Sequence, residues 1–378
     1  MEKNNKEIVL WHEFDGPGDT SIEVLEAICK LYTERFHVQI TPQVMNITEL
    51  TARLNQIKDT RQGPHLAMVP ADMSAYVEKG LYSAVPGGLF EDTLTEGALE
   101  TMQMEGVQYG IPVLRGNHLV VYYNPEIYTS APTTWDVFED AAERLSAQGI
   151  VPIGADLEQG YWFIPFLTAF GGWPVQNGQP NIVTSEMRQA LQFIRDKMDQ
   201  GVLVSLNGST GLLEQFIDGK IGAIICGEWI YNHLDQQMNN RLAVCQLPII
   251  EGRQALSMSS SIGLIYPNQS LTSEERDDIL SFTRFMLSDE CQTMWTLGVQ
   301  RIPAQEEVLN RLAASATPNK KMILSLLDQA RPMPTYPFMI HVWEALNAGL
   351  VELGLSNPEQ ALRRIEQSIK QSWGAYKS

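Results

Sequence analysis

Positive charge is scarce in this chain. Its 378 residues include 27 Lys and Arg against 45 Asp and Glu, which gives a formal net charge of −18. Because nucleic acids and anionic membranes are bound through basic patches, this balance argues against both as partners. Long apolar runs are missing as well, since none approaches the ~20 consecutive apolar residues of a membrane-spanning helix. The composition therefore predicts a soluble globular protein.

An export signal is not evident at the amino terminus. Such a signal joins a positively charged start to about 7–15 apolar residues. Residues 1–7 are instead polar and lead directly into an apolar strand pattern. Two expectations stay open: a cytoplasmic protein, or a mature exported form from which the signal segment has been removed.

Cysteine and histidine are few and scattered. The four cysteines, Cys29, Cys226, Cys245 and Cys291, form no CxxC pair, and the six histidines show no HExxH spacing. We therefore expect no metal site and no cofactor, and we expect the cysteines to be small buried hydrophobic residues. Because Cys226 and Cys245 fall in two candidate strands, a disulfide between them stays open.

Recognisable catalytic motifs are missing too. A GxGxxG pattern begins at position 16 but has Ser21 in place of the last glycine, and neither a GxxxxGK[ST] loop nor a GxSxG elbow occurs. Glycoside hydrolases, however, need only two carboxylates that the fold brings together. Candidates for such a pair, Glu13, Asp72, Asp156 and Glu228, follow strands or lie in loops. A carbohydrate-active hydrolase is therefore the alternative function.

What the chain does have is a set of aromatic residues beside glycines. They occupy three segments, 160–166 (GYWFIPF), 170–173 (FGGW) and 227–231 (GEWIY). Flat aromatic faces with a few polar groups are typical of ligand clefts, and they suit the C–H face of a sugar ring. A buried core would show the same pattern, and we assign Phe163, Phe166 and Phe170 to it.

The first part of the chain alternates strand and helix patterns. Apolar strands at 8–11, 38–40 and 66–69 alternate with a helix that a capping box opens at 20–23, a helix at 50–57 and a short helix ending at Gly80. Such βαβαβ order predicts a mostly parallel sheet covered by helices, with ligands beyond the carboxyl ends of its strands. The loops at 12–19 and 70–72 lie at those ends.

The remainder also predicts an α/β fold, and the chain is long enough for two domains. We expect strands at 119–123, 220–226, 242–247 and 262–266, the last preceded by a flexible polar stretch at 257–261. Helices are expected from the caps at 132–136 to Gly149, over 185–200, from the cap at 272–275 and from Pro358 onward.

Several motifs recur in a familiar order. They are WHEF (11–14), GIP (110–112), YYNP (122–125), PTTWD (132–136), FGG (170–172), GKIGA (219–223), GEW (227–229) and SDE (288–290). In this order they resemble the extracellular solute-binding proteins of the maltose-binding type, family 1, which serve ABC importers. The resemblance covers essentially the whole chain.

The resemblance implies an α/β, two-lobe periplasmic-binding-protein fold of type II, with a ligand cleft between the lobes. The first lobe would combine 1–112 with 262–315, and the second would combine 113–261 with 316–378. Hinges would lie near 112–115, 259–261 and 314–320. Small residues there suit hinges that absorb backbone rotation, although a plain turn would have the same composition.

The resemblance also implies which side chains bind the ligand. Asp72 would accept hydroxyl hydrogen bonds unless it only caps a helix, and Trp229 would stack on a sugar, whereas core packing is the alternative for Trp173 and Trp343. Ser260 would present backbone N–H groups to an anion. The full expected set is His12, Glu13, Asp72, Arg115, Asn117, Tyr161, Trp162, Trp173, Glu228, Trp229, Ser260 and Trp343.

Arg115 and Asn117 depart from the maltose-binding pattern, which has an acidic residue near this position. An arginine in a cleft favours a bidentate acceptor, such as a carboxylate, a phosphate or two adjacent hydroxyls. This puts plain maltose in doubt and leaves an anionic sugar open. The alternative is a structural salt bridge from Arg115 to Glu13 or Asp72.

The function that the resemblance implies is solute capture without catalysis. The chain would bind a sugar or sugar derivative, neutral or anionic, by closure of its lobes, and deliver it to the membrane permease subunits of an ABC transporter. We expect a monomer in the periplasm, or outside the cell as a membrane-anchored protein. Lipid anchoring stays open, and so does a role as a sensor of the same solute.

Overall fold

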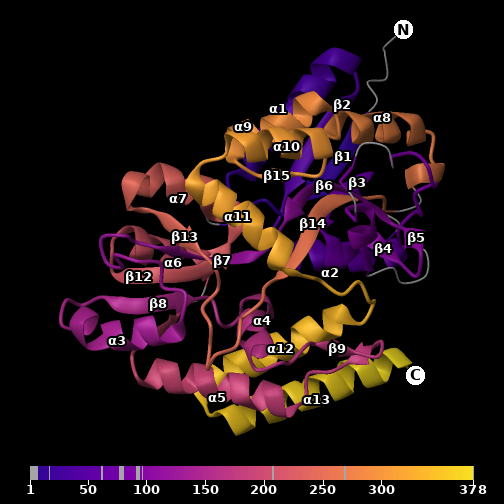
Figure 1. Ribbon diagram of the computed structural model, residues 1–378. Coiled ribbons are helices and arrows are strands. Elements are labelled where there is room, and N and C mark those ends of the chain that lie inside the picture. The colour runs from indigo at the N-terminus through magenta and orange to yellow at the C-terminus, as the bar shows by residue number, and fades with distance from the viewer. Residues whose placement is uncertain are drawn as a thin grey trace. The chain divides into compact units, whose positions relative to one another are not determined.

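The computed structural model describes residues 7–16, 18–60, 63–75, 81–90, 94–95, 97–206, 208–267 and 270–377. Its chain divides into two compact units (Figure 1). Unit 1 comprises Met1–Asn117, Ser260–Ser315 and Thr335–Pro337, and unit 2 comprises His118–Ser259, Ala316–Pro334 and Phe338–Ser378. The first division falls five residues beyond the 112 that the sequence suggested, the second lies two residues before 261, and the return at 335–337 was not expected. The hinges themselves stay predictions.

Unit 1 is built on a mixed sheet. Its strand order is β15 (Ile302–Pro303), β6 (Gly110–Gly116), β14 (Met258–Ile265), β3 (Leu66–Pro70), β1 (Glu7–His12) and β2 (Gln39–Val44). β1 pairs parallel with β2 and β3, whereas β14 is antiparallel to both β3 and β6. The prediction of a mostly parallel sheet was therefore wrong beyond β3. β14 enters from unit 2 and not through a crossover helix, so nothing forces it to run parallel.

Helices of unit 1 flank this sheet. They are α1 (Ser21–Phe36), α2 (Ile47–Thr60), α8 (Arg276–Met286), α9 (Asp289–Val299) and α10 (Glu306–Ser315), with short 3-10 turns at Ala71–Ala75, Leu99–Met102 and Ser270–Thr272 and a hairpin of β4 (Gln103–Met104) and β5 (Val107–Gln108). The expected capping box of α1 was wrong: the Thr20 side chain makes no cap bond, and the Ser21 N–H donates to Asp19 Oδ1 at 2.8 Å. The expected helix end at Gly80 lies outside the described residues.

Two more expectations about local structure were wrong. The polar stretch at 257–261 is not a flexible lead-in, because β14 already begins at Met258 and Ser260 pairs with Gly116. Backbone pairing does not depend on side-chain polarity, so serines do not prevent a strand that has partners. Likewise α8 begins only at Arg276, without a side-chain cap bond.

Unit 2 has its own five-stranded sheet. The order is β11 (Leu203–Ser205), β8 (Val151–Ala155), β12 (Ile221–Gly227), β7 (Leu119–Tyr123) and β13 (Ala243–Cys245). β11 and β12 run parallel to β8, and β7 is antiparallel to both β12 and β13. Cys226 and Cys245 lie on opposite sides of β7, opposite Val120 and Val121, so the strand between them separates the two thiols. Both cysteines are free and buried, and the disulfide left open above does not form.

The helices of unit 2 pack on this second sheet or on one another. They are α3 (Trp135–Ser146), α4 (Gly160–Ala169), α5 (Ser185–Asp199), α6 (Gly208–Ile217), α7 (Tyr231–Met238), α11 (Pro318–Gln329), α12 (Met339–Leu355) and α13 (Pro358–Lys377); a hairpin of β9 (Val175–Gln176) and β10 (Gln179–Pro180), strand β16 (Arg331–Pro332) and 3-10 turns at Glu228–Ile230 and Asn239–Arg241 complete the unit. The predicted α/β class is confirmed. Within the described residues, no helix combines the length and apolarity that a membrane crossing requires.

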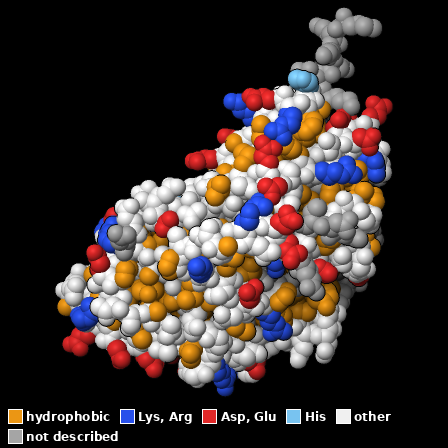
Figure 2. Space-filling view, turned by 45° about the horizontal axis from the view of Figure 1, so that its top comes forward, with side chains coloured by type: hydrophobic (Ala, Val, Ile, Leu, Met, Phe, Trp, Pro, Cys, Tyr) orange, Lys and Arg blue, Asp and Glu red, His pale blue; other side chains and the backbone are white. Residues whose placement is uncertain are grey.

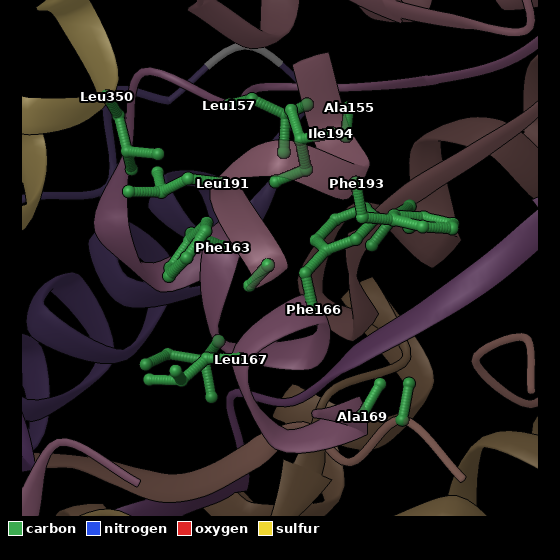
Figure 3. Packing of buried hydrophobic residues seen from close by; sticks show 14 of the residues in the cluster. Ala155, Leu157, Phe163, Phe166, Leu167, Ala169, Leu191, Phe193, Ile194 and Leu350 are labelled. Atoms are coloured by element: carbon green, nitrogen blue, oxygen red, sulfur yellow. The ribbon is translucent and has the colours of Figure 1, made fainter. Parts of the chain in front are cut away.

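The core of unit 2 lies where α4 packs on α5. Phe163 and Phe166 of α4 lie beside Leu191 and Phe193 of α5 there, and the ring centroids of Phe166 and Phe193 are 6.3 Å apart (Figure 3). The assignment of three phenylalanines to the core is confirmed, because Phe163, Phe166 and Phe170 expose only 0%, 1% and 7% of their surface. This buried side of α4 fixes the helix, and its first turn then carries two rings of the candidate site.

Candidate functional site: a row of aromatic rings

Two helices of unit 2 that meet closely support the site. Gly160, the first residue of α4, donates its backbone N–H to Oδ1 of Asn347 on α12 at 2.7 Å. A Cβ at this position would lie 2.9 Å from Cβ of Leu346, which is closer than real side chains approach. Glycine therefore lets α4 start directly against α12. Tyr161 and Trp162 follow on α4, and Trp343 lies on α12, so this contact sets the spacing of their rings.

Four rings form a continuous series, here called the aromatic row: Trp343, Tyr161, Trp162 and Trp229. Centroid distances between successive rings are 6.1, 6.0 and 5.9 Å, with interplanar angles of 57°, 77° and 85°. Tilted and edge-to-face pairs at such distances attract each other by about 0.5–1.5 kcal/mol each. All four residues pack on the core of unit 2 yet stay half-buried. The row is thus a braced apolar surface with ring area left accessible.

A hydrogen bond holds one of these rings in place, and packing holds the others. The Tyr161 hydroxyl donates to the Met258 carbonyl at 3.3 Å. The Trp162 indole N–H is buried near the Cys226 thiol and has no hydrogen-bond partner among the described residues. Burial raises the pKa of that thiol to about 12, so it stays protonated at neutral pH. The rings therefore have fixed orientations before any ligand arrives.

Glu228 sits differently from its neighbour Trp229. Its residue is buried, with 1% exposed, and its backbone N–H donates to the His118 carbonyl at 3.0 Å. His118 contacts the Ile323 carbonyl through Nε2 at 2.9 Å; burial lowers its pKa, and the Glu228 carboxylate acts in the opposite direction. Glu228 thus lies in a cluster of buried polar residues with His118, the first residue of unit 2. Its predicted ligand contact stays a prediction.

Trp173 lies apart from the row. Among the described residues it makes no ring contact with the row, and the guanidinium of Arg331 stacks on its ring at 3.8 Å from the centroid. Residues 173 and 331 are far apart in sequence, so no local pattern indicated this pair. Stacking of Trp173 on a ligand stays a prediction.

In unit 1 the predicted carboxylates Glu13 and Asp72 lie in one electrostatic neighbourhood with Asp15 and Asp19, which were not predicted. Burial raises the pKa of Glu13 to about 8; Asp19 is the next contributor, Arg301 opposes the rise, and Asp15 and Asp72 add smaller increments. His12, at the end of β1, is 1% exposed, and burial lowers its pKa to about 4, so it is neutral at pH 7. The predicted residues His12, Glu13 and Asp72 therefore belong to one region of unit 1.

Arg301 is a residue of this region that the sequence did not single out. It is 1% exposed, its Nη1 donates to Ser21 Oγ at 2.9 Å, and the same nitrogen lies 3.6 Å from Asp19 Oδ2. A lone arginine after α9 gives no signal of such a role. Its buried charge offsets part of the repulsion among the surrounding carboxylates.

The remaining predicted residues lie where β6 and β14 pair. Arg115 donates from Nη1 to Thr95 Oγ1 at 3.0 Å. Gly116 and Asn117 follow with φ angles of 112° and 47°, so two consecutive residues adopt the left-handed region where the chain leaves unit 1. Ser260 is buried in β14 and its hydroxyl donates to the Ser261 carbonyl at 3.2 Å. Ligand contacts of these residues stay predictions.

A chain with two α/β units and a row of half-buried aromatic rings in one of them has the architecture of a solute-binding protein. The family model described as bacterial extracellular solute-binding protein matches residues 27–322. The chain therefore belongs to that family, and the resemblance inferred from its motifs is confirmed.

Curated relatives agree with the family match. The chain is 22% identical over 339 residues to the galactooligosaccharide-binding protein of Bacillus subtilis (strain 168), covering 83% of this chain and 80% of that protein. It is 21% identical over 374 residues to the maltooligosaccharide ABC transporter solute-binding lipoprotein of Streptococcus pneumoniae (strain ATCC BAA-255 / R6), covering 93% and 87%. The maltodextrin-binding protein MdxE of Bacillus subtilis (strain 168) is 18% identical over 301 residues, covering 73% and 70%. The family and these relatives are binding proteins.

Proposed function

We propose that this chain captures an oligosaccharide for an ABC importer and that the aromatic row is its sugar-binding surface. The row carries the proposal because its rings are apolar, half-buried and fixed in orientation. The C–H face of a sugar ring gains by leaving water for such a surface. Rings already braced by their neighbours lose little conformational freedom on binding, which favours affinity.

The length of the aromatic row favours an oligosaccharide over a single sugar as the ligand. Four rings in succession, each about 6 Å from the next, offer more stacking surface than one sugar ring covers. The names of the relatives support the same class of ligand, since they specify galactooligosaccharide, maltooligosaccharide and maltodextrin. A neutral oligosaccharide or a derivative of one is the solute that we propose.

Capture requires no covalent chemistry in this proposal. The chain would act as a monomer outside the cytoplasmic membrane and deliver its solute to permease subunits, as the family description and the transporter named with one relative suggest. Whether a lipid anchors it is a separate question that mass analysis of the native protein answers. The prediction that solute draws the lobes together also stays a prediction, which small-angle scattering with and without solute tests.

A thermal-shift screen tests the proposed function. Galacto- and maltooligosaccharides of increasing length are added to the purified protein, with the monosaccharides as controls. A solute present at 100 times its Kd adds about 2.7 kcal/mol to the free energy of unfolding. We expect stabilisation that grows with chain length and no release of reducing ends during incubation. Absence of stabilisation by every sugar, or steady release of reducing ends, would contradict the proposal.

A further inference from the structure

Arg331 is held in an unusual position on the surface of unit 2. The residue is exposed, and its guanidinium lies 3.8 Å from the centre of the Trp173 ring, well inside the ~6 Å range of cation–π attraction. Trp173 is itself half-buried against the core of unit 2. A flexible arginine side chain is thus fixed against a rigid ring, and stacking occupies the guanidinium face but leaves its N–H edges available.

The backbone places this arginine near one member of the aromatic row. Within β16, Arg331 N–H donates to the Ser257 carbonyl at 2.9 Å, and Arg331 lies opposite Met258 of β14. The carbonyl of the same Met258 accepts the Tyr161 hydroxyl at 3.3 Å. One strand residue therefore connects Tyr161 of the row with the stack of Arg331 on Trp173, and all of these groups belong to unit 2.

The acidic side chains of the chain bear on what the Arg331 guanidinium can bind. Several exposed arginines of the described chain, among them Arg35, Arg188 and Arg311, pair with carboxylates. Others do not: Arg253 donates to the Phe170 carbonyl and Arg284 lies over the Phe90 ring. No carboxylate of the described residues pairs with Arg331, although the chain has 45 acidic residues to 27 basic ones. Figure 2 shows acidic and basic side chains interspersed over the face in view. A guanidinium fork held open in this setting is suited to a carboxylate from outside the chain.

We propose that Arg331, stacked on Trp173, forms a subsite beside the aromatic row that binds the carboxylate of an acidic sugar residue. The inference rests on the proposed function, because the row must bind the adjoining sugars. A net charge of −18 repels an anionic solute at long range. Binding of such a solute therefore needs a local cation, and Arg331 supplies one with bidentate geometry.

Calorimetric titration with two matched ligands tests the subsite. The ligands are two trisaccharides of identical linkage that differ only in the oxidation state of C6. This carbon is a hydroxymethyl group in each sugar of one ligand and a carboxylate in each sugar of the other. Variants Arg331→Gln and Arg331→Lys are compared with the wild type. Arg188→Gln is the control, because Arg188 is an exposed arginine of unit 2 that pairs with Glu359. We expect Arg331→Gln to weaken the carboxylate ligand by about ten- to a hundred-fold, since a charge-assisted hydrogen bond is lost.

The same titrations distinguish failure of the subsite from failure of the proposed function. Affinity for the hydroxymethyl ligand should change less than about three-fold in Arg331→Gln, and Arg331→Lys should retain part of the carboxylate affinity, because an ammonium keeps the charge but not the fork. Wild-type protein that binds the hydroxymethyl ligand but not the carboxylate ligand overturns the subsite and leaves the proposed function intact. Equal losses for both ligands overturn it as well. Binding of neither ligand overturns both.

Discussion

The indole ring of Trp229 lies over the α-carbon of Gly227, in the space that a side-chain β-carbon would fill. Gly227 ends β12 with a φ of −73°, an angle open to any residue, and its carbonyl accepts the Tyr122 hydroxyl at 3.0 Å. The ring, and not the backbone conformation, is therefore what requires glycine here. The position of Trp229, the last ring of the aromatic row, therefore depends on Gly227.

Gly227→Ala tests this relationship. The added methyl group displaces the Trp229 ring, so we expect sugar affinity to fall about ten-fold, equivalent to about 1.4 kcal/mol, while the protein stays folded. Gly211→Ala is the matched control, because nothing lies within 4 Å of a Cβ there. Calorimetry gives the affinities and circular dichroism the melting temperatures. Unchanged affinity in Gly227→Ala would show that the ring position does not matter for binding.

Removing single rings of the row should cost affinity more than stability. We expect Trp162→Ala and Trp229→Ala each to weaken oligosaccharide binding by about ten-fold or more, since burying a large apolar side chain is worth about 1.5–3 kcal/mol. Trp373→Ala is the control: that ring packs on Phe338 at 5.1 Å and is not in the row. Loss of affinity equal to that in the control variant would contradict a binding role for the row.

Tyr161→Phe separates the ring from its hydroxyl. The variant keeps the stacking face but loses the bond to the Met258 carbonyl, so the free energy of unfolding should fall by about 1 kcal/mol and affinity by a few-fold. Tyr128→Phe removes a comparable bond, to the Pro152 carbonyl at 2.8 Å, far from the row in sequence and buried in the core. Tyr128→Phe should lower the free energy of unfolding and leave sugar affinity unchanged. If both variants lose affinity equally, the loss in Tyr161→Phe is not a local effect of its hydroxyl.

Glu13 should make stability depend on pH. Its pKa rises from an ordinary 4.5 to about 8 in the folded protein, so the folded state binds more protons than the unfolded state between these values. Stability attributable to this group therefore falls as pH rises from 4.5 through about 8. At pH 9 we expect Glu13→Gln to be more stable than the wild type by at least about 1 kcal/mol. Melting temperatures from pH 5 to 9 measure this, with exposed Glu34→Gln as control; parallel curves for all three proteins would exclude it.

The thiols should be free and unreactive in the native protein. Burial raises the pKa of Cys29, Cys226 and Cys245 to about 12 and that of Cys291 to about 11, so almost no thiolate exists at pH 8. Titration with a thiol reagent should detect four thiols in denaturant and almost none before unfolding. Fewer than four in denaturant, or a melting temperature that drops on reduction, would indicate a disulfide.

Local pattern was enough to predict much of unit 2. Phe163, Phe166 and Phe170 were assigned to the core, and all three are buried. Tyr161 and Trp162 were singled out through the family resemblance, and periodicity could not have separated them, because residues 163–167 of α4 are all buried. Local pattern also says nothing of which elements meet, and this is why the contact of α4 with α12 was not foreseen.

Long-range partners were what the sequence could not supply. The stacking of Arg331 on Trp173 joins residues far apart in the chain, and the burial of Arg301 beside Ser21 depends on how α9 returns to α1. The prediction of a mostly parallel sheet was wrong beyond β3 for the same reason. β14 crosses from unit 2 and inserts antiparallel between β3 and β6. Such contacts follow from tertiary topology and leave no local trace.

Fluorine NMR of protein labelled with 5-fluorotryptophan tests the central claim most directly. The chain has eight tryptophans, and single Trp→Phe variants assign their resonances. During titration with an oligosaccharide, Trp162, Trp229 and Trp343 should shift along one common binding curve, while the buried Trp135 and Trp295 stay unchanged. If the sugar binds by calorimetry and the three resonances of the row do not move, the aromatic row is not the sugar-binding surface.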